Sequence, residues 1–393
     1  MRFDEIVAPL EARTFTGEYL GRQPLHLQGQ PDKFHQLMSW DVLNQLLDMT
    51  TIWSSVSLLL VMDKESLPKD SYTTPTVGRD GFSVLRPDPR RVKEHLARGA
   101  TLVLNDIDQL TPQLSRFARE LEEVLGGKVQ ANLYLSSKRK QAFRAHFDFH
   151  DVFATHVMGE KTWMVFKGMA EHPIKHPAFE GWSSERHEQL KGELWREVCL
   201  RPGDLLYLPR GQYHYALADD GPCAHIAWGV TYPIGMDAIT YAFERMIGES
   251  VGRANLPREP EALRARLEEI GRTLADKLSA PQAVADMERF CAAYRWPRDS
   301  YDLPGLIERA EEGYRVNGAG LKLVSQGGRF GLVKAGTREA VEVPAAIQPQ
   351  VAWILKREHF AKRELAVAFP AESPAKLDRL LVELRRMALV ESV

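Results

Sequence analysis

Short hydrophobic runs separated by turn signals make up most of the first 233 residues. Seven of them have the length and the content of β-branched and aromatic residues that predict strands: Thr101–Asn105, Val129–Leu135, Phe143–Phe149, Val152–Met158, Thr162–Phe166, Leu205–Leu208 and Ala224–Thr231. Gly159-Glu160-Lys161 predicts a tight hairpin, and Ser115–Val124 predicts an amphipathic helix ended by Gly126-Gly127. Many short strands with irregular connections favour a double-sheet jelly roll decorated by helices.

From residue 234 to 312 the hydrophobic spacing changes to three and four residues, which predicts helices at Met236–Ile247, Glu261–Leu278 and Ala283–Tyr294. The longest carries one apolar stripe, which consists of Leu263, Leu267, Ile270, Leu274 and Leu278. Either core packing or a partner helix can bury such a stripe, and we predict a homodimer through this region.

Residues 313–393 predict a hairpin and three helices. The hairpin joins Leu321–Val324 to Phe330–Lys334 around Gly327-Gly328, and the helices are Gln348–Lys356, Lys362–Ala368 and Pro374–Ala388. This order is the outline of a winged helix. Acidic residues partly balance the basic ones of the last helix (Lys376, Arg379, Arg385 and Arg386 against Glu372, Asp378 and Glu383). A scaffold or protein-docking role is therefore favoured, and we do not expect direct nucleic-acid binding.

The predicted fold class is thus α+β, with a jelly roll at 1–233, a helical dimerisation region at 234–312 and a winged-helix-like domain at 313–393. Composition adds limits on function. The 393 residues include 51 basic and 53 acidic side chains, a net charge of −2 that recruits neither nucleic acid nor an anionic membrane. The three cysteines, Cys199, Cys223 and Cys291, are widely spaced, as expected in a reducing compartment. With no signal peptide or long apolar stretch evident, we expect a soluble, cytoplasmic protein without a membrane partner.

Candidate chemistry lies in two stretches, Ala145-His146-Phe147-Asp148 and the segment from Arg201 to His214. Residues two apart on a strand face the same way, so His146 and Asp148 both face the interior of a barrel. His214 follows Pro-Gly-Asp, an apolar run and a proline, which places it at the barrel rim after a sharp turn. Two imidazoles and one carboxylate are the set that holds non-haem Fe(II) with open positions.

Each of these residues also has an ordinary interpretation: a buried structural histidine, a turn cap and a loop histidine. Zinc is the rival metal, but its helical His-Glu-x-x-His motif is absent, which favours iron. Among the neighbouring histidines, His150 next to Asp151 makes a poor chelate, and His156 shares a face with His150 only along an unbroken strand. His225 is the first alternative for a third ligand or a supporting group.

These residues resemble the JmjC-type, cupin-fold 2-oxoglutarate oxygenases of the ribosomal-oxygenase branch. The resemblance covers nearly the whole chain and is carried by five further segments: residues 15–25, 99–105, 130–135, Asp151-Val152-Phe153 and Gly159–Trp163. It implies Fe(II) on His146, Asp148 and His214, 2-oxoglutarate as cosubstrate and O2 as oxidant.

The resemblance also implies how the cosubstrate binds. Lys161 matches the basic residue that anchors the distal carboxylate, and Asn132 and Tyr134 match positions that hydrogen-bond the cosubstrate. Strand packing is the alternative for Asn132 and Tyr134, and a solvated hairpin position is the alternative for Lys161. Relatives often carry a serine or threonine where this chain has Ala227, so that hydrogen bond must come from elsewhere, with His225 and Tyr134 as candidates.

The implied function is hydroxylation of a protein side chain, most of all an arginine or histidine of a ribosomal protein. Demethylation of a methylated side chain and oxidation of a small peptide natural product are the alternatives, and a non-enzymatic binding module is the second alternative. Two loops, Ser137–Arg144 and Arg210–Tyr215, are predicted to receive the substrate at the mouth of the barrel.

Overall fold

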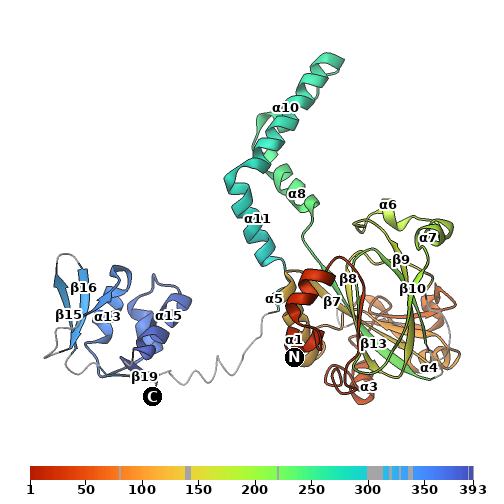
Figure 1. Cartoon of the computed structure of the whole chain (residues 1–393), viewed down its shortest axis with the longest axis horizontal. Helices are drawn as coiled ribbons and strands as arrows, with labels where there is room; N and C mark the ends of the chain where they lie inside the picture. The colour runs from red at the N-terminus through yellow and green to blue at the C-terminus, as the bar shows by residue number, and fades with distance from the viewer. Residues whose placement is uncertain are drawn as a thin grey trace. The chain divides into compact units, whose positions relative to one another are not determined.

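The computed structural model describes nine stretches of the chain: residues 1–78, 81–137, 143–218, 221–298, 313–317, 321–326, 329–334, 340–387 and 389–392. Two compact units, Met1–Arg298 and Asp299–Val393, make up the chain (Figure 1). The helices predicted within 234–312 belong to the first unit, and residues 299–312 lie outside the described part. The division into three domains stays a prediction.

Two antiparallel sheets build the jelly roll of the first unit. The larger has the order β1-β11-β8-β13-β7-β6-β2-β3 and the smaller β10-β9-β12. The strands of the larger sheet are β1 Leu25–Leu27, β2 Leu58–Met62, β3 Glu65–Ser66, β6 Thr101–Leu104, β7 Lys128–Ser136, β8 Asp151–Met158, β11 Leu205–Leu208 and β13 Cys223–Thr231. Those of the smaller sheet are β9 Lys161–Met169, β10 Leu194–Leu200 and β12 Gln212–Ala218. The predicted jelly roll is confirmed, and β10 and β12 are strands that the hydrophobic pattern does not reveal.

Apolar residues from both sheets fill the space between them, in one cluster that contains Val152, Ala154, Trp163, Val165, Val198, Leu200, Leu206 and Leu208. The opposite face of the larger sheet packs on helices, and its core includes Phe117 and Trp228, whose ring centroids are 4.4 Å apart. Alternation thus gives β8 and β13 of the larger sheet two apolar faces, as expected for strands covered on both sides.

Nine helical segments are described before residue 234: α1 Phe3–Val7, α2 Ala12–Thr14, η1 Phe15–Tyr19, α3 Trp40–Asp48, η2 Lys69–Ser71, α4 Pro89–Ala97, α5 Pro112–Leu125, α6 Pro177–Glu180 and α7 Ser184–Leu190. A separate hairpin consists of β4 Thr73–Val77 and β5 Ser83–Pro87. In α5 the Thr111 hydroxyl accepts a hydrogen bond from the Leu114 amide, and Gly126 ends the helix at φ 68°. A serine or threonine N-cap and a left-handed glycine C-cap satisfy the end groups of a helix.

Three predictions about local structure are wrong. Gly159 and Glu160 do not close a hairpin, because β8 belongs to the larger sheet and β9 to the smaller one. Residues 143–149 do not form a strand: within them the structure assigns a single bridge, His146 to His214. His214 does not lie in a loop but on β12. In each case the pairing partner, which is remote in sequence, decides the outcome.

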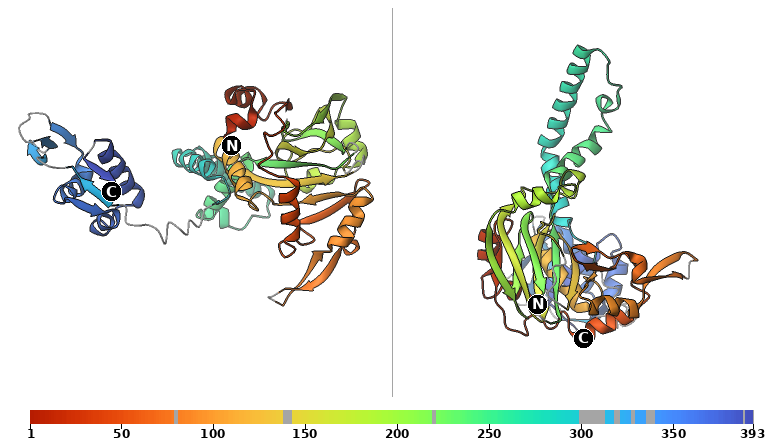
Figure 2. Two further views of the ribbon diagram at one scale, coloured as in Figure 1. Left: turned by 90° about the horizontal axis from the view of Figure 1, so that it is seen from below. Right: turned by 90° about the vertical axis from the view of Figure 1, so that its right-hand side faces the viewer.

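After the jelly roll, four helices form an arm (Figures 1 and 2): α8 Gly235–Met246, α9 Ser250–Arg253, α10 Pro260–Ser279 and α11 Pro281–Ala293. The hydroxyl of Tyr241 on α8 donates to Asp286 on α11 over 2.7 Å. None of the described helices is long and apolar enough to cross a membrane.

Arg298 returns the chain from the arm to the jelly roll. Its guanidinium donates to Glu122 at 2.8 Å, to Asp108 at 2.6 Å and to the Val129 carbonyl at 2.6 Å. The side chains of the three charged residues are at most 7% exposed. A buried arginine satisfied by two carboxylates fixes the position of the segment that carries it.

The described residues of the second unit form two small sheets, β18-β14-β19 and β15-β16-β17, together with three α-helices and one 3-10 helix. Its elements are β14 Gly313–Val316, β15 Leu321–Gln326, β16 Arg329–Lys334, β17 Ala340–Val343, η3 Ala345–Ile347, α13 Gln348–Ile354, β18 His359–Ala361, α14 Lys362–Ala368, α15 Pro374–Arg386 and β19 Val390–Ser392. The predicted hairpin and helices are present, whereas the turn at Gly327-Gly328 lies outside the described residues. Leu365, Leu381 and Val390 contribute to a core of its own, and the winged-helix assignment stays a prediction.

Candidate metal centre

Backbone pairing brings His146 and His214 together. The His146 amide donates to the His214 carbonyl at 3.1 Å, and the His214 amide donates back to the His146 carbonyl at 2.8 Å. The Gly211 amide also donates to the Asp148 carbonyl, at 3.0 Å. Gly211 has φ +89°, and a Cβ there would meet the Ala170 carbonyl oxygen at 2.1 Å, so glycine is required at this close approach.

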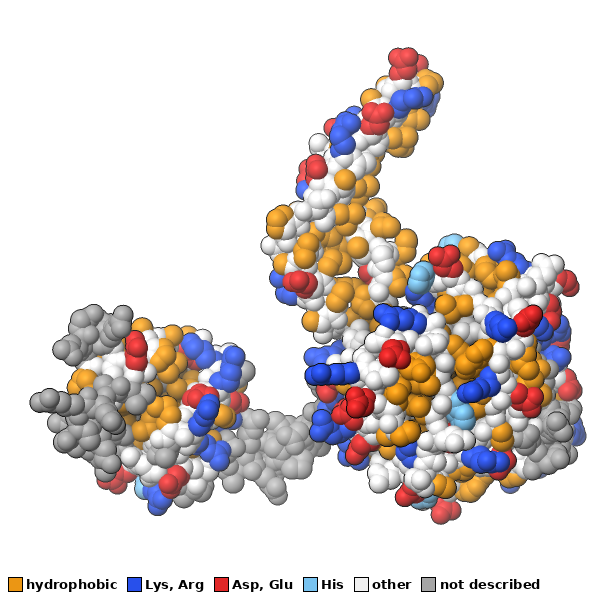
Figure 3. Space-filling view, in the orientation of Figure 1, with side chains coloured by type: hydrophobic (Ala, Val, Ile, Leu, Met, Phe, Trp, Pro, Cys, Tyr) orange, Lys and Arg blue, Asp and Glu red, His pale blue; other side chains and the backbone are white. Residues whose placement is uncertain are grey.

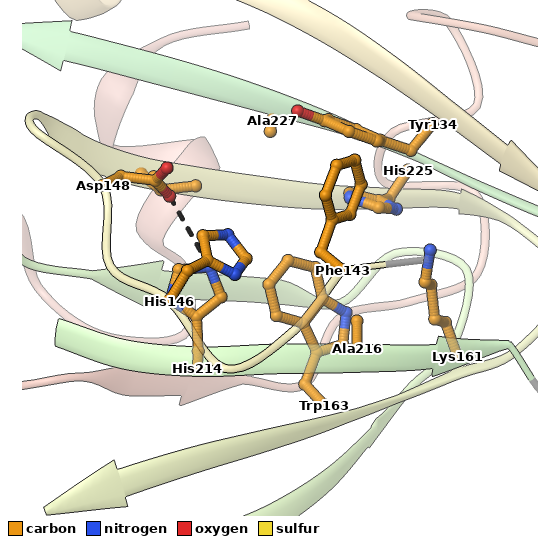
Figure 4. A pocket seen from close by; sticks show the side chains of 11 residues that line it. Tyr134, Phe143, His146, Asp148, Lys161, Trp163, His214, Ala216, His225 and Ala227 are labelled. Atoms are coloured by element: carbon orange, nitrogen blue, oxygen red, sulfur yellow. Dashed lines mark ion pairs between the residues drawn. The ribbon is translucent and has the colours of Figure 1, made fainter. Parts of the chain in front are cut away.

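One ligand atom from each of His146, Asp148 and His214 lies within 4.8 Å of the other two. The His214 Nε2 and the Asp148 Oδ2 are 3.5 Å apart (Figure 4). No other group of three such side chains is found in the described part of the chain. The structure therefore assembles the three residues that the sequence nominated, and it does so without His225.

In both imidazoles, the Nδ1 atom faces a backbone carbonyl. The Nδ1 of His146 lies 2.8 Å from the Arg144 carbonyl, and the Nδ1 of His214 lies 2.9 Å from the Gln212 carbonyl. Because a carbonyl only accepts, each Nδ1 carries the proton and each Nε2 keeps a lone pair. This is how a second hydrogen bond fixes the tautomer of metal-binding histidines.

The protonation states of His214 and Asp148 also suit a cation. Burial lowers the pKa of His214 to about 4, so its ring is neutral at pH 7. Around Asp148, desolvation acts to raise the pKa, but the imidazoles of His214, His146 and His150 together outweigh it, and the pKa lies below its usual value. An ionised carboxylate and neutral imidazoles are the forms that bind a divalent metal.

A cavity of about 260 Å³ opens beside the three ligand atoms. Its walls consist of Tyr134, Phe143, His146, Asp148, Val152, Lys161, Trp163, His214, Ala216, His225 and Ala227 (Figure 4). Two imidazoles, one carboxylate and no thiolate, with an open side toward a cavity, fit non-haem Fe(II). The residue types and the geometry of these three side chains are therefore compatible with Fe(II).

Lys161 lies at the far end of the cavity from Asp148 (Figure 4) and is 3% exposed. Its Nζ donates to the Ser136 hydroxyl at 3.3 Å, and within the described residues no carboxylate pairs with it. Burial lowers the pKa of this lysine. A buried ammonium without a counter-ion is costly, so the arrangement fits an anionic ligand in the cavity. The solvated alternative for Lys161 is wrong.

Tyr134 and Asn132 are separated by the structure. Tyr134 lines the cavity, its ring stacked on His225 with the centroids 4.9 Å apart. Asn132 is not among the lining residues, and its Oδ1 accepts a hydrogen bond from the Asp106 amide at 3.1 Å. Asn132 therefore holds the neighbouring loop that contains Asp106. Its side chain also hydrogen-bonds to Tyr134, so it supports a residue that lines the cavity.

The rival histidines have other surroundings. His156 faces the Gly159 carbonyl through Nε2 at 2.9 Å, and the His150 Nδ1 lies 3.2 Å from the Asp151 carbonyl. His225 lines the cavity next to Trp163, and burial lowers its pKa well below the usual value. The structure leaves it a supporting position and excludes it from the group of three.

Phe143, Val152 and Ala216 also line the cavity, and no sequence pattern predicted this role for them. Strand alternation from Lys161 does place Trp163 on the same face. Of the two predicted mouth loops, residues 138–142 lie outside the described part. The other prediction, a loop at Arg210–Tyr215, is wrong for residues 212–215, which belong to β12. The Arg210 amide, just before this strand, donates to the Asp151 carboxylate of β8 at 2.8 Å.

Comparisons with known proteins agree with this site. Residues 104–237 match the model of the JmjC domain, a range that contains the three candidate ligands and Lys161. The cattle protein Ribosomal oxygenase 2 is 26% identical over 323 residues, 75% of this chain and 64% of that protein. The Drosophila persimilis protein named bifunctional lysine-specific demethylase and histidyl-hydroxylase NO66 is 26% identical over 225 residues, 56% of this chain and 30% of that protein. The chain thus spans less than two thirds of the length of these relatives.

Among solved structures, the Escherichia coli ribosomal oxygenase YcfD in complex with cobalt and succinic acid aligns over 98% of both chains, with a TM-score of 0.50 and 16% identity. At that identity the likeness supports the fold alone. Together with the family match and the curated relatives, it leads to one conclusion: the chain carries a JmjC domain and is related to the ribosomal oxygenases.

Proposed function

We propose that the chain is an Fe(II)- and 2-oxoglutarate-dependent oxygenase that hydroxylates a side chain of a ribosomal protein. The observation that carries the proposal is a single cavity with an open-sided His146, Asp148 and His214 group at one end. At the other end lies Lys161, which has no carboxylate partner in the described part of the chain. The names of the relatives, ribosomal oxygenase and histidyl-hydroxylase, support the reaction and the substrate class.

In this proposal His146, Asp148 and His214 hold Fe(II). Bound Fe(II), with 2-oxoglutarate and O2, supplies the oxidising power that converts a C–H bond to an alcohol, with succinate and CO2 as the other products. The protein's part is to keep both Nε2 lone pairs and the carboxylate aimed at one point. The carbonyls of Arg144 and Gln212 do this by fixing the two rings.

Lys161 binds the distal carboxylate of 2-oxoglutarate. An ion pair formed in a buried cavity is strong because little water screens it. The Tyr134 hydroxyl is the next candidate for a hydrogen bond to the cosubstrate, and its raised pKa, about 12 through burial, keeps it a donor at pH 7. Ala227 offers no hydroxyl, as the sequence predicted, although it does line the cavity.

Apolar and aromatic walls exclude water from the reaction. Phe143 and Trp163 stand on either side of the metal end, and the Trp163 ring stacks on His214 at a centroid distance of 5.6 Å. Excluding water strengthens the charge interactions in the cavity and protects reactive species from side reactions.

The proposal is tested with purified protein, Fe(II), 2-oxoglutarate and ribosomes under air. We expect succinate to form and mass spectrometry to find one ribosomal peptide with an extra oxygen atom, most of all at a histidine or arginine. Asp148→Ala is the matched inactive control. If a methylated side chain loses a methyl group instead, the reaction is demethylation and the proposed hydroxylation is wrong. If another peptide is oxidised while ribosomal proteins stay unmodified, the proposed substrate is wrong.

A homodimer through the helical arm is also proposed. On α8 and at its C-cap, four apolar side chains at helical spacing are more than half exposed: Met236, Ile239, Phe243 and Ile247. None of the twenty residues of α10 is buried, despite its apolar stripe. Figure 3 shows hydrophobic side chains gathered along this arm. A surface of this kind is typical of a protein interface, and a second copy would bury it.

For the second unit we propose a protein-docking or scaffold role. On and near α15, Lys376 pairs with Glu372 and Lys362 pairs with Asp378, both at 2.6 Å. Such pairing removes the excess positive charge that a nucleic-acid-binding helix needs. Unchanged migration of short DNA and RNA duplexes with the full chain at moderate salt is the expected result.

A further inference from the structure

Two buried ring nitrogens beside the cavity have no hydrogen-bond partner among the residues that the structure describes. They are the Nε1 of Trp163 and the Nδ1 of His225. Both residues line the cavity, and they are 4% and 3% exposed. A buried donor without a partner destabilises a protein by about 1–3 kcal/mol, so native proteins rarely keep one unless a ligand completes it.

The two rings lie close to Lys161. Lys161 and Trp163 are two residues apart on β9 and face the same way, while His225 comes from β13 in the opposite sheet. The Trp163 and His225 rings meet edge to face, with centroids 5.1 Å apart. Figure 4 shows the Lys161 ammonium, the His225 ring and the Trp163 indole nitrogen at the end of the cavity away from Asp148.

Both rings are held in place by their neighbours. Trp163 stacks on His214 at an interplanar angle of 27°, and His225 stacks on Tyr134 at 6°. Stacking of this kind restricts rotation of the rings, so the nitrogens cannot turn away to find other partners. The indole nitrogen is a donor, and the imidazole Nδ1 is a donor in one of the two neutral tautomers of His225, so both can bind an acceptor from this fixed position.

The chemistry of this end of the cavity selects an anion. Lys161 and Trp163 offer only N–H groups. The one acceptor assigned to Lys161 in the described structure is the Ser136 hydroxyl, which is shared with Thr101 at 2.9 Å. A carboxylate has two oxygens with about four acceptor positions, enough for an ammonium and two ring N–H groups. Ala227 and Ala216, which also line the cavity, offer no polar side chain.

We propose that Trp163 and His225 complete, with Lys161, the site for the distal carboxylate of the keto-acid cosubstrate. The indole N–H and an imidazole N–H on Nδ1 take the place of the hydroxyl that Ala227 lacks. This inference rests on the proposed function and deepens it: Lys161 supplies the charge, and the two rings determine the selection of a dicarboxylate over a monocarboxylate keto acid.

The test is a binding experiment without turnover. The full chain, loaded with Mn(II) and kept free of oxygen, is titrated with 2-oxoglutarate and with pyruvate, a keto acid without the second carboxylate. Trp163→Phe and His225→Leu remove one donor each, and His225→Asn restores an N–H. Trp228→Phe is the matched control, since its indole donates to the Thr155 hydroxyl at 3.1 Å and does not line the cavity.

We expect Trp163→Phe and His225→Leu each to weaken 2-oxoglutarate binding by about 10-fold or more, because hydrogen bonds to a charged group are strong. Pyruvate and Mn(II) affinities stay unchanged, as does 2-oxoglutarate binding by Trp228→Phe, and His225→Asn recovers part of the loss. In the NMR spectrum of protein loaded with diamagnetic Zn(II) in place of Mn(II), whose unpaired electrons would broaden signals this near the metal, the indole N–H signal that Trp163→Phe removes shifts with 2-oxoglutarate and not with pyruvate.

Wild-type affinity for 2-oxoglutarate in both donor-removing variants overturns this inference and leaves the proposed function standing. An equal loss of pyruvate and 2-oxoglutarate binding also overturns it, because the rings then act on the metal end of the cavity. Failure of the wild-type protein to bind 2-oxoglutarate at all overturns the proposed function itself.

Discussion

Replacing the buried Lys161 by methionine is expected to stabilise the protein and to abolish cosubstrate binding. Methionine has nearly the same length as lysine and fills the same space. The substitution removes one hydrogen bond, the one from the Lys161 ammonium to Ser136, and the Ser136 hydroxyl keeps Thr101 as a partner. Replacing buried ionic groups by apolar side chains of similar volume has stabilised other proteins by about 1–4 kcal/mol. We expect the same range for the free energy of unfolding of Lys161→Met at pH 7.

The pH dependence gives this prediction a second signature. Burial lowers the pKa of Lys161 below its ordinary value of 10.5, so between the folded and unfolded pKa values the unfolded chain binds more protons. Stability of the wild-type protein therefore rises with pH in that window. The penalty from Lys161 is fully present below the folded-state pKa and disappears as pH approaches 10.5. The difference in the free energy of unfolding between Lys161→Met and the wild type should therefore become smaller as pH rises toward 10.5.

Urea unfolding at pH 7 and at pH 9.5 measures both effects, with and without Mn(II) and 2-oxoglutarate. A ligand at 100 times its dissociation constant stabilises the wild type by about 2.7 kcal/mol, and the variant should show no such gain. Lys167→Met is the control: this lysine is on the same strand, but its side chain is 59% exposed and pairs with Glu193 at the surface. A variant at Lys161 that is less stable than wild type at pH 7 would refute the reasoning.

Three further outcomes are expected. Arg298→Met leaves the buried carboxylates of Asp108 and Glu122 without their partner and should lower the free energy of unfolding by about 3–5 kcal/mol in urea titrations; a loss below 1 kcal/mol would contradict the assigned contacts. Gly203→Ala should lower the free energy of unfolding by at least about 2 kcal/mol, because φ is +93° and a Cβ would lie 1.9 Å from a backbone oxygen. Wild-type stability of this variant would show that the turn can rearrange to accept a Cβ. Phe243→Glu should convert a dimer to a monomer in sedimentation at micromolar concentration, and a wild type that is itself monomeric would refute the proposed dimer.

The sequence was sufficient to select His146, Asp148 and His214 as candidates, because their residue types and spacing are visible in it. The strand alternation invoked for the first two does not hold, since residues 143–149 form no strand; backbone hydrogen bonds to His214 and Gly211 position this segment instead. Sheet membership was not predictable from local patterns: nothing local shows that the turn at Gly159 leads into the other sheet, or that residues 143–149 pair at one position only. Arg298 was missed because its partners, Asp108 and Glu122, are more than 170 residues away.

The reciprocal backbone bonds between His146 and His214 have a consequence for the proposed metal centre. Since main-chain pairing sets the spacing of the two rings, the arrangement of these two proposed ligands does not depend on an ion. Exchange of one divalent ion for another would then demand no refolding, so the identity of the metal would follow supply and ligand preference.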